Sequence, residues 1–350
     1  MTDQTKALRI EENVPLAPMT TFGIGGAARF FAEAKTEAEV AAALGFAGER
    51  GLPVFILGGG SNVLIADSGF SGLVLRVAVR GVSFGEETEG RVAATAGAGE
   101  DWDEFVASTV ARDLQGVECL SGIPGLVGGT PVQNVGAYGQ EVSETIVSVR
   151  VLERATGAVT ELSNAGCGFG YRESIFNTTM RDRFIVLAVT FSLVPNGRPK
   201  IVYKDLKERF GDSRPSLAEV REAVRGIRAE KGMLVRQGGA DARSAGSFFK
   251  NPIVSEAHFA EITKELPNVP GYPAGGGMIK IPAAWLIEKS GFQKGFTLGE
   301  AGLSTVHTLA LTNRGAANAA SIITLKDEIQ KGVRARFGIE LRPEPVFVGF

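Results

Sequence analysis

The stretch FILGGGSNVLIADSGF occupies residues 55–70 and places three consecutive glycines directly after a short apolar run. The apolar run is typical of a buried strand, and the glycines are typical of a turn where no Cβ blocks a close approach to the backbone. Backbone N–H groups in such a turn can converge on phosphate oxygens. The stretch therefore predicts a strand that ends in an anion-binding turn, although a tight turn without a ligand is also compatible with it.

The three glycines do not fit the simplest dinucleotide-binding motif. Gly58 and Gly60 supply the first two glycines of G-x-G-x-x-G, but Val63 holds the third position and no helix pattern begins there. A nicotinamide site of the Rossmann type is therefore disfavoured.

The segments around this turn alternate between strand and helix patterns. Thr36 is placed to cap a helix over 36–48, and a second helix is expected over 101–113. Apolar and β-branched runs predict strands at 52–57, 72–79, 91–99, 146–154, 158–162 and 184–194. This order of elements indicates an α+β fold with considerable antiparallel pairing.

A break at residues 194–201, VPNGRPKI, predicts a boundary before a second unit. Beyond it, Ser216 and Glu219 have capping-box spacing at the start of an amphipathic helix over 216–231. Further helices are expected over 283–291 and 318–338, and strands over 306–311 and 345–350.

The composition is that of an ordinary globular protein, since 44% of the 350 residues are hydrophobic and 22% are charged. A chain of this length is expected to form two or three packed units. A formal net charge of −2 gives no electrostatic reason to expect nucleic acid or a membrane surface as a partner. The N-terminal stretch has no apolar signal core, and no apolar run approaches ~20 residues, so we expect a cytoplasmic protein.

Cysteine and histidine are too sparse for a disulfide framework or a metal site. Cys119 and Cys167 are expected to be small buried apolar residues. His258 and His307 lie in the C-terminal half, away from the glycine-rich stretches, so neither is expected to bind a metal or to attach a cofactor covalently there.

A second glycine-rich stretch, LSGIPGLVGGTPVQNVGAYGQEV at residues 120–142, contains Gln133, Asn134 and Tyr138. Side-chain amides offer both donors and acceptors to a heteroaromatic edge, as a flavin or an adenine requires. Two such loops in one chain therefore indicate an extended cofactor.

Six motifs occur in order along the chain: TTFGIGG at 20–26, GGGSNVL at 58–64, SGIPGLVGGTPVQNVGAYG at 121–139, GYRESIF at 170–176, AGSFFKNP at 245–252 and RPEPVFVG at 342–349. Together they closely resemble the UDP-N-acetylenolpyruvoylglucosamine reductases, the flavoenzymes of peptidoglycan precursor synthesis. The resemblance extends from about residue 15 to the end of the chain.

This resemblance implies an α+β protein in which a two-lobed FAD-binding domain of the vanillyl-alcohol-oxidase (PCMH) type is followed by a separate α+β substrate-binding domain. We expect the first lobe over residues 1–75, the second over 76–197 and the substrate-binding domain over 198–350, with the C-terminal strand returning to the active site.

The resemblance also implies FAD as the cofactor and NADPH as the reductant. Because no histidine lies near the glycine-rich stretches, we expect the FAD to be bound without a covalent link. Backbone of the first glycine turn would surround the pyrophosphate, and the second loop would line the ribityl chain and the isoalloxazine. The implied FAD contacts are Leu57, Gly58, Gly59, Gly60, Ser61, Asn62, Ser121, Gly122, Gly125, Gly128, Gly129, Gln133, Asn134, Gly136, Ala137 and Tyr138.

The implied reaction carries a hydride from NADPH through the flavin to the vinyl carbon of UDP-N-acetylglucosamine enolpyruvate, which gives UDP-N-acetylmuramate. Arg172 would polarise the substrate carboxylate, because its fork suits an enolate-like dianion. Ser247 would give a proton to the α-carbon with the help of a nearby cation such as Lys250, and Glu344 would lie opposite the arginine.

Tyr203 matches the tyrosine that folds over the substrate diphosphate in one subtype of this family, so the chain resembles the tyrosine-loop subtype. The other implied substrate contacts are Tyr171, Lys231 and Asn251. The expected partner is this small-molecule substrate alone, bound by a monomer, with no nucleic acid and no membrane.

Two other functions stay open on the sequence. One is a flavin-dependent alcohol or sugar oxidase of the same fold, which would pass electrons to oxygen. The lack of a linking histidine and the set of Arg172, Ser247 and Glu344 argue against it. The other is a nucleotide-sugar or flavin-binding module without turnover.

Overall fold

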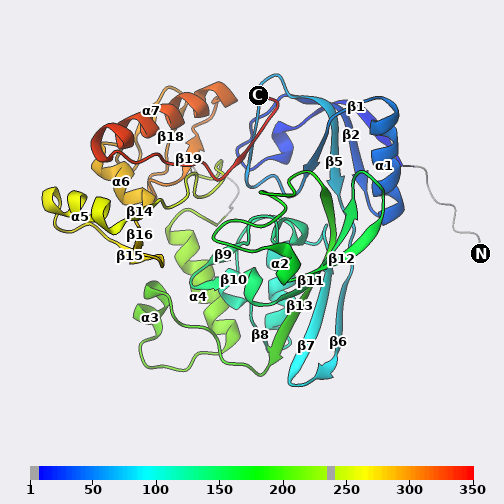
Figure 1. Ribbon diagram of the computed structural model, residues 1–350, viewed down its shortest axis with the longest axis horizontal. Helices are drawn as coiled ribbons and strands as arrows, with labels where there is room; N and C mark the ends of the chain where they lie inside the picture. The colour runs from blue at the N-terminus through cyan, green and yellow to red at the C-terminus, as the bar shows by residue number, and fades with distance from the viewer. Residues whose placement is uncertain (1–7, 235–240) are drawn as a thin grey trace, which may run out of the picture. The chain divides into compact units, whose positions relative to one another are not determined.

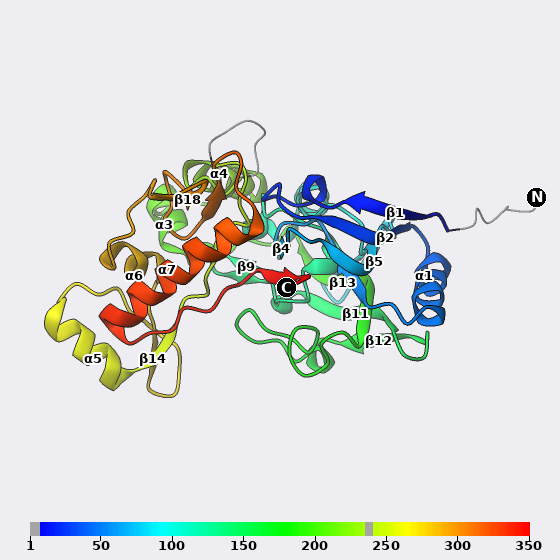
Figure 2. The same ribbon diagram turned by 90° about the horizontal axis from the view of Figure 1, so that it is seen from above.

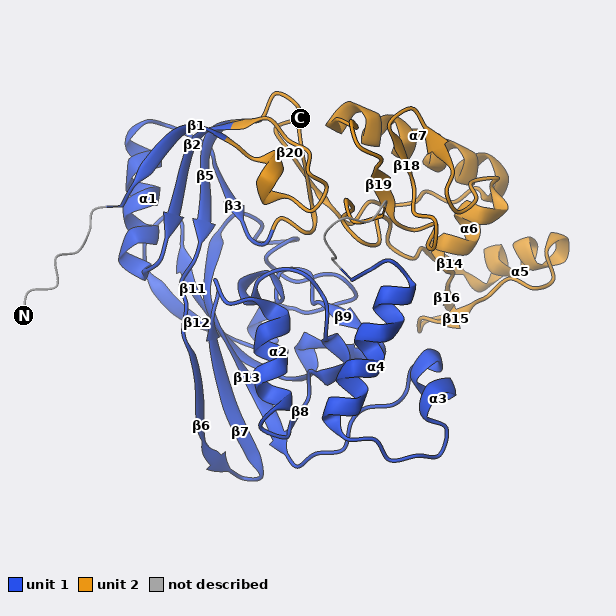
Figure 3. Cartoon of the chain, turned by 180° about the vertical axis from the view of Figure 1, so that it is seen from behind, with its two compact units in different colours: residues 1–14, 28–59, 71–234 blue, residues 15–27, 60–70, 235–350 orange. Residues whose placement is uncertain are grey.

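The computed structural model describes residues 8–234 and 241–350. The chain divides into two compact units, coloured blue and orange in Figure 3. The first unit comprises Met1–Val14, Ala28–Gly59 and Ser71–Leu234, and the second comprises Pro15–Ala27, Gly60–Phe70 and Val235–Phe350. The lobe and domain boundaries that the family resemblance implies stay predictions.

A four-stranded sheet in the order β1-β2-β5-β3 carries the first glycine turn. Its strands are β1 (Ile10–Pro15), β2 (Ala27–Ala34), β5 (Phe70–Val77) and β3 (Val54–Leu57). Helix α1 (Glu37–Glu49) follows β2, and the Thr36 side chain caps it by accepting from the N–H of Glu39 at 3.2 Å. Because β3 pairs in parallel with β5, with Leu57 opposite Arg76, the glycines begin at the carboxyl end of two parallel strands.

A six-stranded sheet carries the second glycine loop, and its strand pairs are antiparallel, as the sequence pattern predicts. Its main path runs β12-β11-β13-β7-β6, and β8 pairs with β13 beside this path (Figure 1). The strands are β6 (Val82–Thr88), β7 (Arg91–Gly97), β8 (Leu114–Gln115), β11 (Ile146–Glu153), β12 (Val159–Ser163) and β13 (Phe184–Pro195).

Helix α2 (Trp102–Val110) packs its aromatic residues against this sheet. The rings of Trp102 and Phe105 both contact the ring of Phe191 on β13, with centroids 5.8 and 5.0 Å apart. The indole N–H of Trp102 also donates to the carbonyl oxygen of Leu120 at 3.0 Å. The apolar core of the first unit therefore fixes the start of the second glycine loop.

Two further helices, α3 (Lys204–Phe210) and α4 (Leu217–Glu230), belong to the first unit. The capping box of Ser216 and Glu219 forms as its spacing predicts. The apolar face of α4 packs around Cys119 and Tyr138 in a small cluster with Leu206. Both cysteines are buried, as predicted.

The second unit places the C-terminal strand beside the first glycine turn. Strand β4 (Val63–Ile65) pairs in parallel with β20 (Val346–Val348), so residues nearly 300 positions apart lie side by side (Figure 2). A strand rather than a helix thus follows Gly60, as the poor match to the dinucleotide motif indicates.

The described part of the second unit also contains α-helices and small antiparallel sheets. The helices are α5 (Glu256–Glu265), α6 (Ala283–Lys289) and α7 (Ala319–Phe337), and α6 contacts α7. The strands are β14 (Ile253–Ser255), β15 (Tyr272–Pro273), β16 (Met278–Lys280), β17 (Thr297–Leu298), β18 (Ala301–Leu303) and β19 (Leu311–Asn313). A separate apolar core holds them together, with Leu286, Ile322 and Ile329 fully buried.

The prediction of a strand over 306–311 is wrong, because strand pairing begins only at Leu311. The hydroxyl of Ser304 accepts hydrogen bonds from the N–H groups of Val306 and His307, and the N–H of Ala310 donates to the carbonyl oxygen of His307. These local bonds turn the backbone and compete with extended pairing.

Within residues 8–234 and 241–350, no helix is both long and apolar enough to cross a membrane.

Candidate active site

Two of the three consecutive glycines are required by the protein's own packing. A Cβ on Gly59 would lie 2.7 Å from the Cα of Gly125, so the two glycine-rich loops touch at this point. A Cβ on Gly60 would lie 1.9 Å from the carbonyl oxygen of Met19, and Gly60 has a φ of 66°. Both positions exclude side chains even without a ligand.

Gly58 differs from its neighbours. A Cβ added to Gly58 would meet no atom of the described residues within 4 Å, and the same is true of Gly129 in the second loop. Protein packing therefore gives no reason for glycine at these two positions. A bound group that approaches the backbone closely would supply one.

The first unit contains a cavity of about 450 Å³, which is lined by Glu33, Lys35, Arg76, Ala78, Arg80, Gly99 and Leu126. Arg76 is the β5 residue that pairs with Leu57, directly before Gly58. Three cations against one carboxylate give the lining a net positive charge. With the open backbone at Gly58, this donor set fits a group that carries phosphates, as FAD does.

The second loop folds into a short hairpin of β9 (Gly136–Ala137) and β10 (Gln140–Glu141), joined through Tyr138. Tyr138 and Asn134 have φ values of 48° and 44°, a region that non-glycine residues seldom occupy. Such strain tends to gather at functional sites. Of the predicted FAD residues in this loop, Ser121, Gly122, Asn134, Gly136 and Tyr138 are buried, Gly125, Gly128, Gln133 and Ala137 are half-buried, and Gly129 is exposed.

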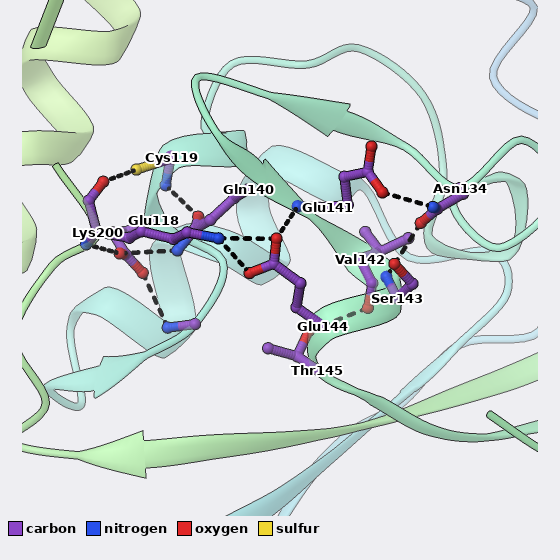
Figure 4. A network of polar contacts seen from close by, with 11 residues as sticks. Glu118, Cys119, Asn134, Gln140, Glu141, Val142, Ser143, Glu144, Thr145 and Lys200 are labelled. Carbon is purple, nitrogen blue, oxygen red and sulfur yellow. Dashed lines mark hydrogen bonds and ion pairs between the residues drawn. The ribbon is translucent and has the colours of Figure 1, made fainter. Parts of the chain in front are cut away.

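A buried network of hydrogen bonds joins the two ends of this loop (Figure 4). Glu118 is fully buried and accepts hydrogen bonds from the amide of Gln140 at 2.9 Å, from the N–H of Gly116 at 2.8 Å and from the N–H of Lys200 at 3.1 Å. The N–H of Cys119 donates in turn to the Gln140 side-chain oxygen at 2.8 Å. Three donors satisfy the buried carboxylate, so the loop ends are firmly held.

The side chain of Asn134 points toward the hairpin rather than away from it (Figure 4). Its amide nitrogen donates to Glu141 at 2.8 Å and to the carbonyl oxygen of Gly170 at 3.0 Å, and its oxygen accepts from the N–H of Ser143 at 3.1 Å. Asn134 therefore ties the loop to the GYRESIF motif and acts on the loop's shape. A direct contact of its side chain with FAD stays a prediction.

Arg172 is held against the same hairpin. Its guanidinium donates to the carbonyl oxygen of Gly136 at 2.7 Å and lies 5.7 Å from the centre of the Tyr171 ring. The backbone of Arg172 also has a φ of 57°. Three predicted site residues, Asn134, Tyr138 and Arg172, thus share the left-handed conformation in one part of the first unit.

Tyr138, Tyr203 and Lys231 form one cluster. The rings of Tyr138 and Tyr203 meet edge to face with centroids 5.4 Å apart, and the Lys231 ammonium lies 6.0 Å from the Tyr138 ring centre. Asp205 forms an ion pair with Lys231. Burial acts to lower the pKa of Lys231, but the hydrogen bond and charge of Asp205 raise it above the usual value, so the ammonium stays charged.

Sequence reasoning missed a buried arginine, Arg228. Its guanidinium donates to the carbonyl oxygens of Gly122 at 3.0 Å and Met233 at 2.9 Å, and burial lowers its pKa. Arg228 lies three positions after Arg225 and seven after Arg221. That spacing on one helix face is the signal in the sequence that points to a carboxylate or a carbonyl partner.

Asp103 is the partner of the other two arginines of this face. It bonds Arg221 at 2.5 and 3.1 Å, contacts Arg225 and accepts from the N–H of Gly122 at 2.6 Å. Burial acts to raise its pKa, but the hydrogen bonds from Arg221 and Gly122 hold it below the usual value. Both backbone polar groups of Gly122 are therefore hydrogen-bonded, the N–H to Asp103 and the carbonyl oxygen to Arg228.

Ser247 and Glu344 belong to the second unit, on two neighbouring backbone segments. The N–H of Glu344 donates to the carbonyl oxygen of Phe248 at 2.9 Å, and the N–H of Lys250 donates to that of Arg342 at 2.9 Å. Both Ser247 and Glu344 have half-buried side chains. That they meet Arg172 around one substrate stays a prediction.

Asn62 and Asn251 are tied into the second unit as well. The Asn62 amide donates to the carbonyl oxygen of Glu344 at 3.3 Å, and the Asn251 side-chain oxygen accepts from the N–H of Ala283 at 2.9 Å, where α6 begins. Both side chains are thereby oriented by the fold, and that of Asn251 presents its NH₂ group as the end that can donate to a ligand.

Comparison with known proteins matches two family models to this chain. Residues 28–163 match an FAD-binding domain, and residues 238–348 match the C-terminal domain of UDP-N-acetylenolpyruvoylglucosamine reductase. The glycine turn, the second loop and the cationic cavity all lie within the first match or at its edge. The fold and the site define a flavoprotein with an FAD-binding domain.

Full-length relatives narrow this class. The UDP-N-acetylenolpyruvoylglucosamine reductase of Thermobifida fusca is 48% identical to the chain, over 96% of this chain and 97% of the relative. The reductase of Nocardia farcinica is 47% identical, over 97% of this chain and 90% of the relative. A crystal structure of the reductase from Thermus caldophilus aligns with a TM-score of 0.66 at 25% identity, over 97% of this chain and 99% of that one. The chain belongs to the UDP-N-acetylenolpyruvoylglucosamine reductase family. It is an oxidoreductase of peptidoglycan precursor synthesis that acts on a small-molecule UDP-sugar.

Proposed function

We propose that this chain reduces the enolpyruvyl ether of UDP-N-acetylglucosamine enolpyruvate to the lactyl ether of UDP-N-acetylmuramate, with NADPH as the reductant. The observation that carries the proposal is the placement of Arg172, whose strained backbone and 2.7 Å bond to Gly136 hold a guanidinium against the hairpin of the second glycine loop. Bound FAD supplies the hydride that the vinyl carbon receives.

Arg172 stabilises the negative charge that the reaction places on the substrate. Addition of a hydride to the vinyl carbon moves an electron pair through the α-carbon toward the carboxylate, where a bidentate donor is more effective than the point charge of a lysine. The bond to Gly136 uses one guanidinium nitrogen and fixes the plane of the group.

Ser247 gives its proton to the α-carbon, which completes the saturated ether. A serine hydroxyl is a weak acid, so this step needs a nearby cation and a relay that returns the proton. Lys250 is three residues away in the same segment. Its N–H bond to Arg342 helps to hold this segment beside that of Glu344.

Glu344 acts from the neighbouring segment as a hydrogen-bond partner of the substrate carboxylate. Pro343 and Pro345 restrict the backbone on both sides, and the N–H of Glu344 is fixed by Phe248 at 2.9 Å. A carboxyl group held in this way can donate to the developing enol oxygen when it is protonated.

The nucleotide end of the substrate is bound by Tyr203, Lys231 and Asn251, with Tyr171 closer to the reacting end. The cluster of Tyr138, Tyr203 and Lys231 supports this proposal, because it combines aromatic faces with a cation that suits a diphosphate. We further propose a monomer as the working unit. Since NADPH and UDP-sugars are coenzymes and precursors of the cytoplasm, we place the reaction there.

The purified protein tests the whole proposal in one anaerobic cuvette. NADPH should bleach the flavin absorption, and UDP-N-acetylglucosamine enolpyruvate should then restore it without oxygen. Recovery of the colour in air alone, with none on addition of the enolpyruvyl sugar, would support an oxidase of the same fold instead. No bleaching by NADPH would leave a binding module as the better description.

A further inference from the structure

The ion pair of Asp205 and Lys231 joins the first turn of α3 to the end of α4. Its two side chains are 27% and 39% exposed, so solvent reaches the pair but does not surround it. The ammonium of Lys231 carries its full charge and is bound to a carboxylate of the protein itself.

The residues around this pair are those proposed to bind the diphosphate. Tyr203 directly precedes α3 and lies two positions before Asp205, and its ring contacts that of Tyr138 with centroids 5.4 Å apart. The same Tyr138 ring lies 6.0 Å from the Lys231 ammonium. Asp205 is thus a negative charge within a cluster proposed to receive a dianionic ligand.

A diphosphate that approaches Lys231 meets both an attraction and a repulsion. An ammonium has three N–H donors, so Lys231 can bond a phosphate while it keeps Asp205. The carboxylate of Asp205 then lies close to the phosphate with the same sign of charge, which opposes binding. The net affinity depends on the balance of these two charges.

We propose that Asp205 is a positioning residue that weakens the binding of a diphosphate by Lys231 and so sets the affinity of the protein for its UDP-sugar. The inference rests on the proposed role of Lys231. The product of the proposed reaction keeps the diphosphate of the UDP-sugar and must leave the protein in every catalytic cycle. The carboxylate of Asp205 competes with the diphosphate for the Lys231 ammonium and so favours release of the product.

Calorimetric titration of the FAD-loaded protein with UDP and with uridine tests this inference. Asp205→Asn keeps the shape of the side chain and removes its charge. We expect UDP to bind roughly fivefold more tightly to this variant, near the upper end of the effect of a partly exposed ion pair, while the affinity for uridine is unchanged. Asp205→Glu, which restores the charge, should return the affinity for UDP to near the wild-type value.

Steady-state kinetics gives a second readout that a merely structural role would not reproduce. Asp205→Asn should lower KM for the enolpyruvyl sugar without an increase in kcat. An unchanged flavin absorption spectrum would show that the variant is folded. If Asp205→Asn lowers the affinity for UDP or leaves it unchanged, Asp205 does not oppose binding of the diphosphate and the inference is wrong.

Two controls separate the possible explanations. Asp212 is an exposed aspartate shortly after α3, so Asp212→Asn removes the same charge from the same segment and should change UDP affinity less than twofold. If both variants bind UDP more tightly by the same factor, the effect comes from the overall charge of the protein and the inference is wrong. Lys231→Met should weaken UDP. If the affinity of Lys231→Met for UDP does not fall, the proposed role of Lys231 is wrong. If it falls while Asp205→Asn shows no tighter binding of UDP, only the proposed role of Asp205 is wrong.

Discussion

The side-chain amide of Asn62 donates a hydrogen bond to the backbone carbonyl of Glu344 over 3.3 Å, although 282 residues separate them. The N–H of Val346 returns a bond to the carbonyl oxygen of Asn62 at 3.0 Å, and β4 and β20 continue the pairing beyond it. The segment that follows the first glycine turn therefore holds the backbone of the proposed acid, so a change in this turn will reach Glu344 as well as the FAD contacts proposed for the turn.

Gly58 and Gly60 of the first turn should respond differently to substitution by alanine. Gly60→Ala forces a methyl group against the Met19 carbonyl in a left-handed conformation, and we expect a loss of several kcal/mol and poor folding. Gly58→Ala meets no protein atom, so the melting temperature of the FAD-free protein should stay near wild type while FAD affinity falls at least tenfold. Fluorescence titration with FAD measures the affinity. Unchanged FAD binding by Gly58→Ala would mean that no ligand approaches this backbone.

Ser247→Ala should separate the two half-reactions. Without a positioned proton donor, reoxidation of the flavin by the enolpyruvyl sugar should slow by roughly 10²-fold or more, whereas reduction by NADPH should keep its rate. Stopped-flow absorbance follows each step. Ser244→Ala, three residues earlier in the same segment, serves as the control and should leave both rates within a few-fold of wild type. Wild-type turnover by Ser247→Ala would remove Ser247 from the mechanism.

Arg172→Lys should retain FAD but lose most of its turnover. Lysine keeps the charge but cannot donate both to the Gly136 carbonyl and to a carboxylate in a fixed plane. We expect kcat to fall by roughly 10²-fold, which corresponds to the loss of one positioned charge-stabilising donor. Arg181→Lys, at an exposed arginine of the same loop region, is the matched control. Equal kinetics for Arg172→Lys and wild type would place the carboxylate site elsewhere.

Asp103→Asn should weaken the fold at neutral pH and not in acid. The pKa of Asp103 lies below its usual 3.8, so the carboxylate stabilises the folded state fully above pH 3.8, and this contribution is lost as the pH falls through the lowered pKa. The variant should unfold about 2 kcal/mol more easily at pH 7, a typical value for hydrogen bonds to a charged group. Denaturant titrations at pH 7 and at low pH give the comparison. A deficit that persists unchanged below the folded-state pKa would contradict the role of the charge.

Many elements were predictable because the signals that form them are local. Thr36 and Ser216 cap helices by bonding N–H groups three residues away, and the apolar run before Gly58 forms β3 as expected. The strand expected over 306–311 failed for an equally local reason, since the Ser304 hydroxyl turns the chain there. Ordered motifs also indicated the family correctly, and relatives at 48% and 47% identity confirm it.

The reasons behind individual site residues were not predictable. Glycine at position 59 is required by Gly125, and the grip on Gly122 comes from Asp103 on α2 and Arg228 on α4. No periodicity or cap reports such partners, because they are brought together by the path of the chain rather than by their spacing along it.

Local hydrogen bonds and the alternation of apolar residues are properties of short segments, so the order of residues alone established the α+β class, most helices and strands, and the motifs that mark a flavoprotein. Contacts over long separations depend on how strands pair and helices pack, which is why only the folded chain placed Asn62 on Glu344, Arg172 on Gly136 and Asp205 on Lys231. The proposed chemistry of this protein depends on the first two contacts, and its proposed affinity for a diphosphate depends on the third.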